Sequence, residues 1–186
     1  MTTTNIILIV VAVIVIAIIA MYNGLVRLKV RLTEAYSDMD VQLKRRYDLI
    51  PNLIATVKGY AAFEQATLEK VINARNQAMA LANGNSAERL KAEDNLGSTL
   101  KSLFALSESY PDLKANQSFL DLQRELTDTE DKIMASRRFY NSNVRDFNTK
   151  LQVFPTNIFG KVLGFKAEAF FEIADATQKE NIRVEF

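Results

Sequence analysis

One stretch near the N-terminus, residues 6–22, limits what this chain can fold into. It is an unbroken run of apolar side chains without proline, glycine or charge, and twelve of its seventeen residues are Ile, Leu or Val. A helix through it would be roughly 25 Å long, close to the ~30 Å hydrocarbon core of a bilayer. At about −0.3 to −0.6 kcal/mol for each residue, the twelve favour insertion by roughly 4–7 kcal/mol. We predict a transmembrane helix that contacts membrane lipid through residues 6–22.

Two other interpretations of this stretch are a buried helix of a soluble protein and a cleaved signal peptide. No basic residue precedes the run, and A-I-I-A at Ala17–Ala20 lacks a small-x-small cleavage site, which disfavours a signal peptide. Arg27, Lys29 and Arg31 follow the run. The positive-inside rule therefore favours a single-pass protein with residues 1–5 as a short outer tail and the C-terminal portion in the cytoplasm. A periplasmic or extracellular C-terminal portion is the alternative.

The pattern after this anchor is helical and heptad-like. Apolar residues from Leu25 onward recur at spacings of three and four, which builds a seam for coiled-coil-like packing against other helices. A second seam, from Phe119 to Leu151, is the most regular in the chain. Only three prolines and six glycines occur in 186 residues, which disfavours a turn-rich β fold. We predict an all-α protein in which a long antiparallel bundle of three to four helices follows the transmembrane helix.

Breaks in the apolar pattern divide the remaining chain. N-G-N-S at Asn83–Ser86 predicts the end of one helix and the start of the next, and Phe154-Pro155 closes the last long helix. We therefore assign residues 23–155 to the bundle domain and residues 156–186 to an aromatic-rich C-terminal cap and tail. A short helix and loop at residues 159–173 would cap the bundle; an interfacial or partner-binding patch is the alternative.

Pro51 lies inside the first helical seam. Proline removes one helix hydrogen bond and clashes with the preceding turn, at about 3 kcal/mol in a helix interior. The apolar spacing nevertheless passes through Pro51 without a glycine or a polar loop beside it. We predict a helix kink at Pro51, with the apolar face continuing to Ala82, and a tight hairpin is the alternative. The last long helix is expected to begin at Ser118, in a capping-box-like sequence.

Four strings spread in order over the predicted domain carry a family resemblance. They are Q-L-K-R-R-Y-D-L-I-P-N-L (Gln42–Leu53), S-E-S-Y-P-D-L-K-A-N (Ser107–Asn116), L-Q-R-E-L (Leu122–Leu126) and R-R-F-Y-N (Arg137–Asn141). Together they resemble the LemA family of bacterial membrane proteins. The resemblance implies a single-pass anchor in the bacterial inner membrane that carries an all-helical bundle. It implies little chemistry; some relatives are linked to invaginated organelle membranes, and others to membrane proteolysis or signalling.

Several charged residues fall at or near the apolar seams, where an unpaired buried charge would cost several kcal/mol. They are Glu64, Arg75, Glu108, Glu130 and Arg137. We predict that they form buried structural ion pairs that fix the register of the helices. A di-iron site would require histidine, which the chain lacks, and an all-oxygen Ca²⁺ or Mg²⁺ site is the alternative. The basic run Lys44–Arg46 is expected to form ion pairs within the bundle or between protomers.

No residue is predicted to be catalytic or to bind a metal or cofactor. The chain has neither Cys nor His, and it contains no nucleophile-elbow or phosphate-binding motif. Its net charge of +1, with acids and bases interspersed, argues against a nucleic-acid surface, and no small-molecule substrate is evident. We predict a non-enzymatic membrane-anchored scaffold or adaptor that forms homo-oligomers and contacts a membrane-protein partner. The alternative is a metal-dependent or other enzyme in a carboxylate-containing helical bundle.

The last six residues, 181–186, alternate apolar and polar side chains. In an extended strand, Val184 and Phe186 would face the same side. One interpretation is an ordinary chain end, frayed or folded back onto the bundle. The other is a partner-binding tail that adds to the sheet edge of another protein through Val184 and Phe186.

Overall fold

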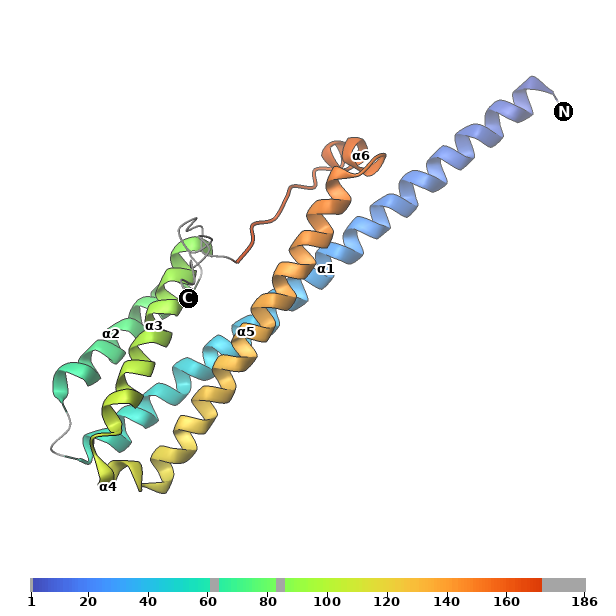
Figure 1. Cartoon of the computed structure of the whole chain (residues 1–186). Helices are drawn as coiled ribbons and strands as arrows, with labels where there is room; N and C mark the ends of the chain where they lie inside the picture. The colour runs from blue at the N-terminus through green and yellow to red at the C-terminus, as the bar shows by residue number, and fades with distance from the viewer. Residues whose placement is uncertain (1, 61–63, 83–85, 172–186) are drawn as a thin grey trace, which may run out of the picture. The chain divides into compact units, whose positions relative to one another are not determined.

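The computed structural model describes residues 2–60, 64–82 and 86–171, and every regular element within these ranges is a helix. In chain order the helices are α1 (Thr3–Lys58), α2 (Gln65–Ala80), α3 (Ser86–Ser107), α4 (Pro111–Lys114), α5 (Gln117–Gln152) and α6 (Thr156–Val162) (Figure 1). The predicted all-α class is therefore confirmed. As predicted, α2 ends before Asn83, at Ala80, and α3 begins at Ser86, while Phe154 and Pro155 lie between α5 and α6.

The chain forms two compact units. Unit 1 contains Met1–Val41 and Met134–Phe170, and unit 2 contains Gln42–Ile133 with Phe171. The long helices α1 and α5 each contribute to both units, because each helix runs across the boundary in the sequence.

Unit 1 packs the C-terminal half of α5, together with α6, against α1 (Figure 1). Its core side chains recur three, four or seven residues apart on α1 and α5: Leu25, Leu32, Ala35, Met39, Tyr140, Val144 and Phe147. This spacing places them on one face of each helix, as the heptad pattern predicted. Among the described residues, α1 is the one helix long and apolar enough to cross a membrane. Its most apolar stretch of 18 residues has a mean hydropathy of 3.1 and is not buried against the rest of the chain.

Unit 2 is a helical bundle built from the end of α1, α2, α3, the single turn α4 and the start of α5. The helices α2 and α3 lie side by side (Figure 1). The buried core includes these apolar residues: Leu43, Ile50, Leu53, Val57, Leu68, Val71, Ala74, Ala78, Leu90, Leu96, Leu100, Leu103, Leu113, Phe119 and Leu126. Their burial provides the hydrophobic stabilisation of the unit, at about 25 cal/mol for each Å² of apolar surface removed from water.

The helix α1 continues through Pro51 and ends at Lys58. A hairpin corner at Pro51 is therefore excluded, whereas a kink there stays a prediction. The expectation that the apolar face continues in one helix to Ala82 is wrong, because α2 begins only at Gln65. Gly59 directly follows α1, and glycine costs about 1 kcal/mol relative to alanine inside a helix, which favours an end at this point.

The helix α5 begins one residue earlier than predicted, and a different side chain caps it. The Oδ1 atom of Asn116 accepts a hydrogen bond from the backbone N–H of Phe119 at 3.0 Å. This is the N-cap geometry that asparagine provides as well as serine does. The Nδ2 atom of Asn116 also donates to the hydroxyl of Tyr60 at 2.9 Å, which fixes the amide in its capping position. Asn116 is therefore the cap, and Ser118 lies in the first turn.

The C-terminal cap predicted at residues 159–173 corresponds to α6 and to the non-helical stretch that follows it, as far as residue 171. The proposed partner-binding tail, with Val184 and Phe186, lies outside the described residues.

Candidate functional site: the Arg46 cluster

A charged side chain is buried within unit 2. Arg46 is on α1, three residues after Leu43 and four before Ile50, so helical spacing directs it toward the core. It is 1% exposed and is among the largest of the fully buried side chains. Removing a guanidinium from water costs several kcal/mol unless carboxylates and hydrogen bonds replace the lost hydration.

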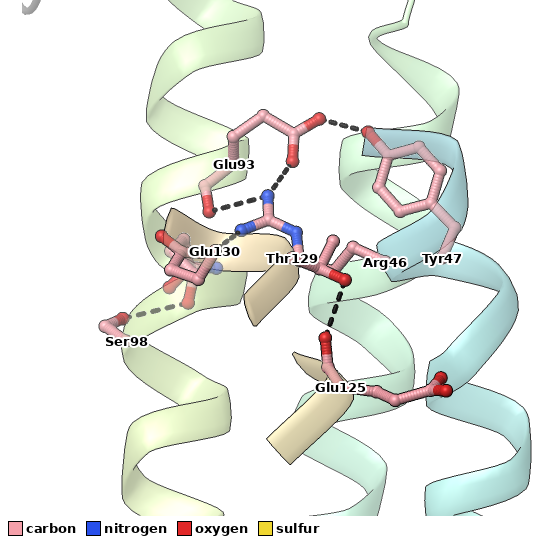
Figure 2. Close-up of polar contacts among 8 residues, drawn as sticks. Arg46, Tyr47, Glu93, Ser98, Glu125, Thr129 and Glu130 are labelled. Carbon is pink, nitrogen blue, oxygen red and sulfur yellow. Dashed lines mark hydrogen bonds and ion pairs between the residues drawn. The ribbon is translucent and has the colours of Figure 1, made fainter. Parts of the chain in front are cut away.

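Two glutamates from different helices provide that compensation. One terminal nitrogen of Arg46, Nη2, donates to the carboxylate of Glu93 on α3 and, at 3.4 Å, to the backbone carbonyl of the same residue. The other, Nη1, donates to Oε2 of Glu130 on α5 at 2.6 Å. Figure 2 shows the guanidinium between the two carboxylates. A single arginine thus joins α1, α3 and α5.

The second carboxylate oxygen of Glu93 accepts a hydrogen bond from the hydroxyl of Tyr47, the residue after Arg46 (Figure 2). Glu93 is 1% exposed, so both of its oxygens are satisfied within the core rather than by bulk water. We call Arg46, Tyr47, Glu93 and Glu130 the Arg46 cluster. The buried Arg89 is close enough to act electrostatically on Tyr47, so two positive charges stand against two carboxylates in this region.

The environment of Tyr47 fixes its protonation state. Burial raises the pKa of the phenol well above its ordinary value of 10, and the hydrogen bond to Glu93 and the negative charge of Glu93 raise it further. The nearby arginines act in the opposite direction without reversing the shift. Tyr47 is therefore neutral at physiological pH and serves as a hydrogen-bond donor.

Arg75, on α2, compensates for the proline in α1. Its Nε atom donates to the backbone carbonyl of Tyr47 at 2.8 Å. In a regular helix this carbonyl would accept from the N–H of the residue four positions later, which is Pro51 and has no N–H. Arg75 supplies the missing donor. The proline in α1 and the arginine in α2 are therefore two parts of one structural device.

The five charged residues that were predicted to form buried ion pairs do not all lie in one cluster. Glu130 belongs to the Arg46 cluster, Arg75 contacts the backbone beside it, and Arg137 is half-buried on α5 in unit 1. Glu64 and Glu108 are exposed, so the prediction of burial does not hold for them.

Both exceptions have a local cause. Glu64 immediately precedes α2 and accepts a 3.4 Å hydrogen bond from Thr67. The break after Lys58 resets the helical phase that had placed Glu64 at the seam. Glu108 follows the end of α3 and pairs with Lys114, and both side chains are more than half exposed.

Sequence reasoning missed Glu93 and Tyr47 as site residues, although a signal was present. Glu93 lies three residues after Leu90 and three before Leu96, so it is a charge within an apolar seam. The expectation for the run Lys44–Arg46 is confirmed at Arg46, whose ion pairs are within unit 2. Arg45, by contrast, is half-exposed and 3.9 Å from Glu125.

Chemically, the cluster is suited to holding helices in register. Its carboxylates are engaged by an arginine and a tyrosine, and its tyrosine is kept neutral. Within residues 2–60, 64–82 and 86–171, no three acidic side chains come together as a metal site would require.

Known proteins are similar to this chain over a range that includes unit 2. The sequence model of the LemA family matches residues 35–186. Protein LemA of Metamycoplasma hominis is 30% identical over 155 residues, which cover 82% of this chain and 69% of that protein. Magnetosome protein MamQ of Magnetospirillum gryphiswaldense is 22% identical over 174 residues, covering 81% of this chain and 64% of that protein. The range matched by the family model spans the Arg46 cluster, and the chain belongs to the LemA family.

Proposed function

We propose that this protein is a non-enzymatic scaffold or adaptor, anchored in the bacterial inner membrane through residues 6–22. The observation that carries the proposal is that the buried carboxylate of Glu93 is engaged on both oxygens, by Arg46 and by Tyr47. A general acid or base must face a substrate and change protonation near the working pH. Glu93 is enclosed by Arg46 and Tyr47, and Tyr47 is held neutral, so neither group is placed for that work.

A scaffold benefits from such a cluster because its function depends on one defined surface. Removing one partner of a buried pair costs about 3–5 kcal/mol, so a misaligned helix that leaves Arg46 unpaired is strongly disfavoured. The cluster therefore favours one register of α1, α3 and α5 over its neighbours. This role as a register device is the best-attested use of buried polar groups in helical assemblies.

We propose further that the protein acts as a homo-oligomer that organises a membrane-protein partner. The relatives called magnetosome protein MamQ support a role connected with membranes. Amine-reactive cross-linking of the full-length chain in native membranes tests the assembly, and we expect ladders of discrete multimers. Monomers alone, at cross-linker doses that modify the exposed lysines, would contradict the scaffold function.

The side of the membrane is a separate part of the proposal. Arg27, Lys29 and Arg31 follow the apolar run and favour a cytoplasmic C-terminal portion. Fusions of alkaline phosphatase and of green fluorescent protein to Phe186 distinguish the two sides. We expect a fluorescent and phosphatase-negative pair, whereas active phosphatase would transfer the partner to the periplasmic or extracellular side.

A metal-dependent enzyme is the alternative function, and elemental analysis of the purified full-length protein separates it from a scaffold. We expect substoichiometric transition metal after purification without chelators. A stoichiometric metal that survives dialysis would overturn the non-enzymatic proposal.

A further inference from the structure

Unit 1 exposes a group of large apolar side chains around α6. They are Val153, Phe154, Ile158, Val162 and Leu163, with Phe154 and Val162 exposed to 79% and 81%. We call these five residues the α6 patch. Single exposed apolar residues are common, whereas a contiguous group on and beside one short helix marks a binding surface.

The helix α6 has the reverse of the pattern that water favours. Thr156 and Gly160, four residues apart, are buried against unit 1. Ile158 and Val162, also four residues apart, are exposed. Because residues at this spacing share a face, the small and polar side of the helix faces the protein and the apolar side faces outward. A helix with this orientation is suited to surroundings less polar than water.

Contacts within unit 1 place α6 at the end of the apolar run. A Cβ atom on Gly160 would lie 2.8 Å from Leu151 Cδ2 of α5 and 3.8 Å from Leu25 Cδ1 of α1, so the absent side chain lets α6 approach α5 closely at a place where Leu25 is also near. The ring of Phe165, just after α6, lies 6.0 Å from the ring of Tyr22. Tyr22 ends the apolar run, and Leu25 is only ~4.5 Å further along the helix axis.

The length of the apolar run places the bilayer boundary at the same level. Residues 6–22 provide roughly 25 Å of apolar helix, whereas the hydrocarbon core is ~30 Å thick. The remaining ~5 Å corresponds to about one helical turn. If residue 6 lies at the far boundary, the near boundary falls close to Leu25, which lies beside Gly160 of α6.

The charges in this region suit the headgroup layer. Between Phe147 and Ala167 the chain carries Lys150, Lys161 and Lys166 and no acidic residue. The first acidic residue beyond this stretch, Glu168, is paired with Lys29 of α1. Lysines next to an apolar surface can extend toward lipid phosphates while their methylene chains remain in apolar surroundings.

We propose that the α6 patch inserts into the boundary between headgroups and acyl chains, as a second membrane contact beside the transmembrane helix. This contact rests on the membrane anchoring proposed above. It would hold unit 1 at the bilayer surface through both α1 and α6, and so limit rotation of the unit about the α1 axis. The occupant of the patch is lipid, since it adjoins the end of the apolar run and is bordered by lysines.

The absence of tryptophan from the sequence permits a direct test. Full-length single-tryptophan variants Phe154→Trp, Tyr22→Trp and Phe139→Trp are reconstituted into phosphatidylcholine–phosphatidylglycerol vesicles with or without lipids brominated on the acyl chain. Tyr22→Trp reports insertion of the anchor itself. Phe139→Trp is the matched control, because Phe139 is 57% exposed on α5, roughly 20 Å along the helix from its end at Gln152, just before Phe154.

We expect bromolipid quenching of Phe154→Trp to approach that of Tyr22→Trp and to exceed clearly that of Phe139→Trp. Quenching of Phe154→Trp no greater than that of Phe139→Trp, with Tyr22→Trp strongly quenched, would overturn the second contact and leave the anchor intact. A blue-shifted but unquenched Phe154→Trp would show that protein covers the patch, which also overturns the proposal. Weak quenching of Tyr22→Trp itself would contradict the anchor and, with it, the proposed function.

Discussion

The two units use the same long helices but hold them together by different interactions. In unit 2, α1 and α5 are joined through a buried guanidinium and two carboxylates, and the charged residues Arg46, Arg89 and Glu93 are all fully buried. In unit 1, aromatic rings join α1 and α5, as in the edge-to-face contact of Tyr36 with Tyr140 at 5.6 Å. Every fully buried charge in the described part of the chain belongs to unit 2.

This difference shows how one helix pair can be robust in one region and sensitive in another. Apolar and aromatic packing loses stability in proportion to the volume removed, and tolerates small changes in geometry. A buried ion pair depends on both partners, because the one left behind is an uncompensated charge. We therefore expect single charge deletions to destabilise unit 2 sharply and unit 1 only weakly.

The largest expected effect comes from Arg46→Ala. It leaves Glu93 buried without its positive partner and should lower the free energy of unfolding by about 3–5 kcal/mol. The adjacent Arg45→Ala is the matched control; its half-exposed pair with Glu125 should contribute about 1 kcal/mol or less. Urea denaturation of the full-length chain in detergent micelles, followed by helical circular dichroism, measures both. Equal losses would show that burial does not distinguish these two arginines.

A smaller effect is expected from Tyr47→Phe, which removes a hydrogen bond to a buried carboxylate. The loss should be about 1.5–3 kcal/mol, against about 0.5–1.5 kcal/mol for Tyr140→Phe in unit 1, whose hydroxyl donates to the backbone carbonyl of Ala169. The same denaturation measurement at neutral pH compares them. A larger loss from Tyr140→Phe would reverse the proposed contrast between the units.

The raised pKa of Tyr47 adds a dependence on pH. The neutral phenol is favoured by the fold, so its contribution is complete below the ordinary tyrosine pKa of 10 and declines as the pH rises above it. Wild-type stability should therefore fall by up to about 1.4 kcal/mol per pH unit in that alkaline range. Urea denaturation at pH 10 and at about one unit higher measures this change. The loss of stability between the two pH values should be smaller for Tyr47→Phe than for wild type. Parallel falls would assign the alkaline instability to other groups.

A double-mutant cycle on Pro51 and Arg75 should give an interaction free energy of about 1–3 kcal/mol between the two residues. Arg75→Ala leaves the carbonyl of Tyr47 without a donor, because Pro51 has none to offer. Pro51→Ala restores an N–H at the position four residues later, so Arg75→Ala should be less damaging in that background. Identical losses in the two backgrounds, measured by urea denaturation, would show that Arg75 acts independently of the proline.

The sequence predicted the burial of Leu43, Ile50 and Leu96 because helical periodicity alone decides which face of a helix is apolar. It did not predict the end of α1, since apolar spacing runs on past Gly59 and outweighed the weak local preference of one glycine. The presence of the helices and the burial of these apolar side chains could thus be predicted from the sequence, whereas the end of α1 could not.

The partners of the buried charges were harder to predict from the sequence, for a different reason. Arg46 and Glu93 are 47 residues apart, and their pairing depends on which helices become neighbours in the bundle. Apolar periodicity shows that a charged residue lies in a seam, but it does not show which residue of another helix lies opposite. The partner of Arg75 is a backbone carbonyl, which no pattern of charged side chains reveals. Only the missing N–H of Pro51, four residues after Tyr47, pointed to a carbonyl in need of a donor.

The smallest expected effect concerns the ion pair of unit 1, between Lys29 and Glu168. Its side chains are 43% and 30% exposed, so water and salt screen the attraction. The segment around Glu168 is also held independently, because Asn148 donates to the Glu168 carbonyl and accepts from its N–H, both at 2.9 Å. Lys29→Met keeps most of the apolar length of the side chain and should change stability by about 1 kcal/mol or less.

Asn148→Ala is the matched comparison, since it removes two backbone hydrogen bonds and leaves the ion pair in place. It should lower stability by about 1–3 kcal/mol. Denaturation of both variants at low and high salt separates the contributions: the effect of Lys29→Met should shrink with added salt, and that of Asn148→Ala should not. If Lys29→Met lowered stability as much as Arg46→Ala does, charge pairing would stabilise both units alike. The proposed contrast, between buried ion pairs in unit 2 and aromatic packing in unit 1, would then be wrong.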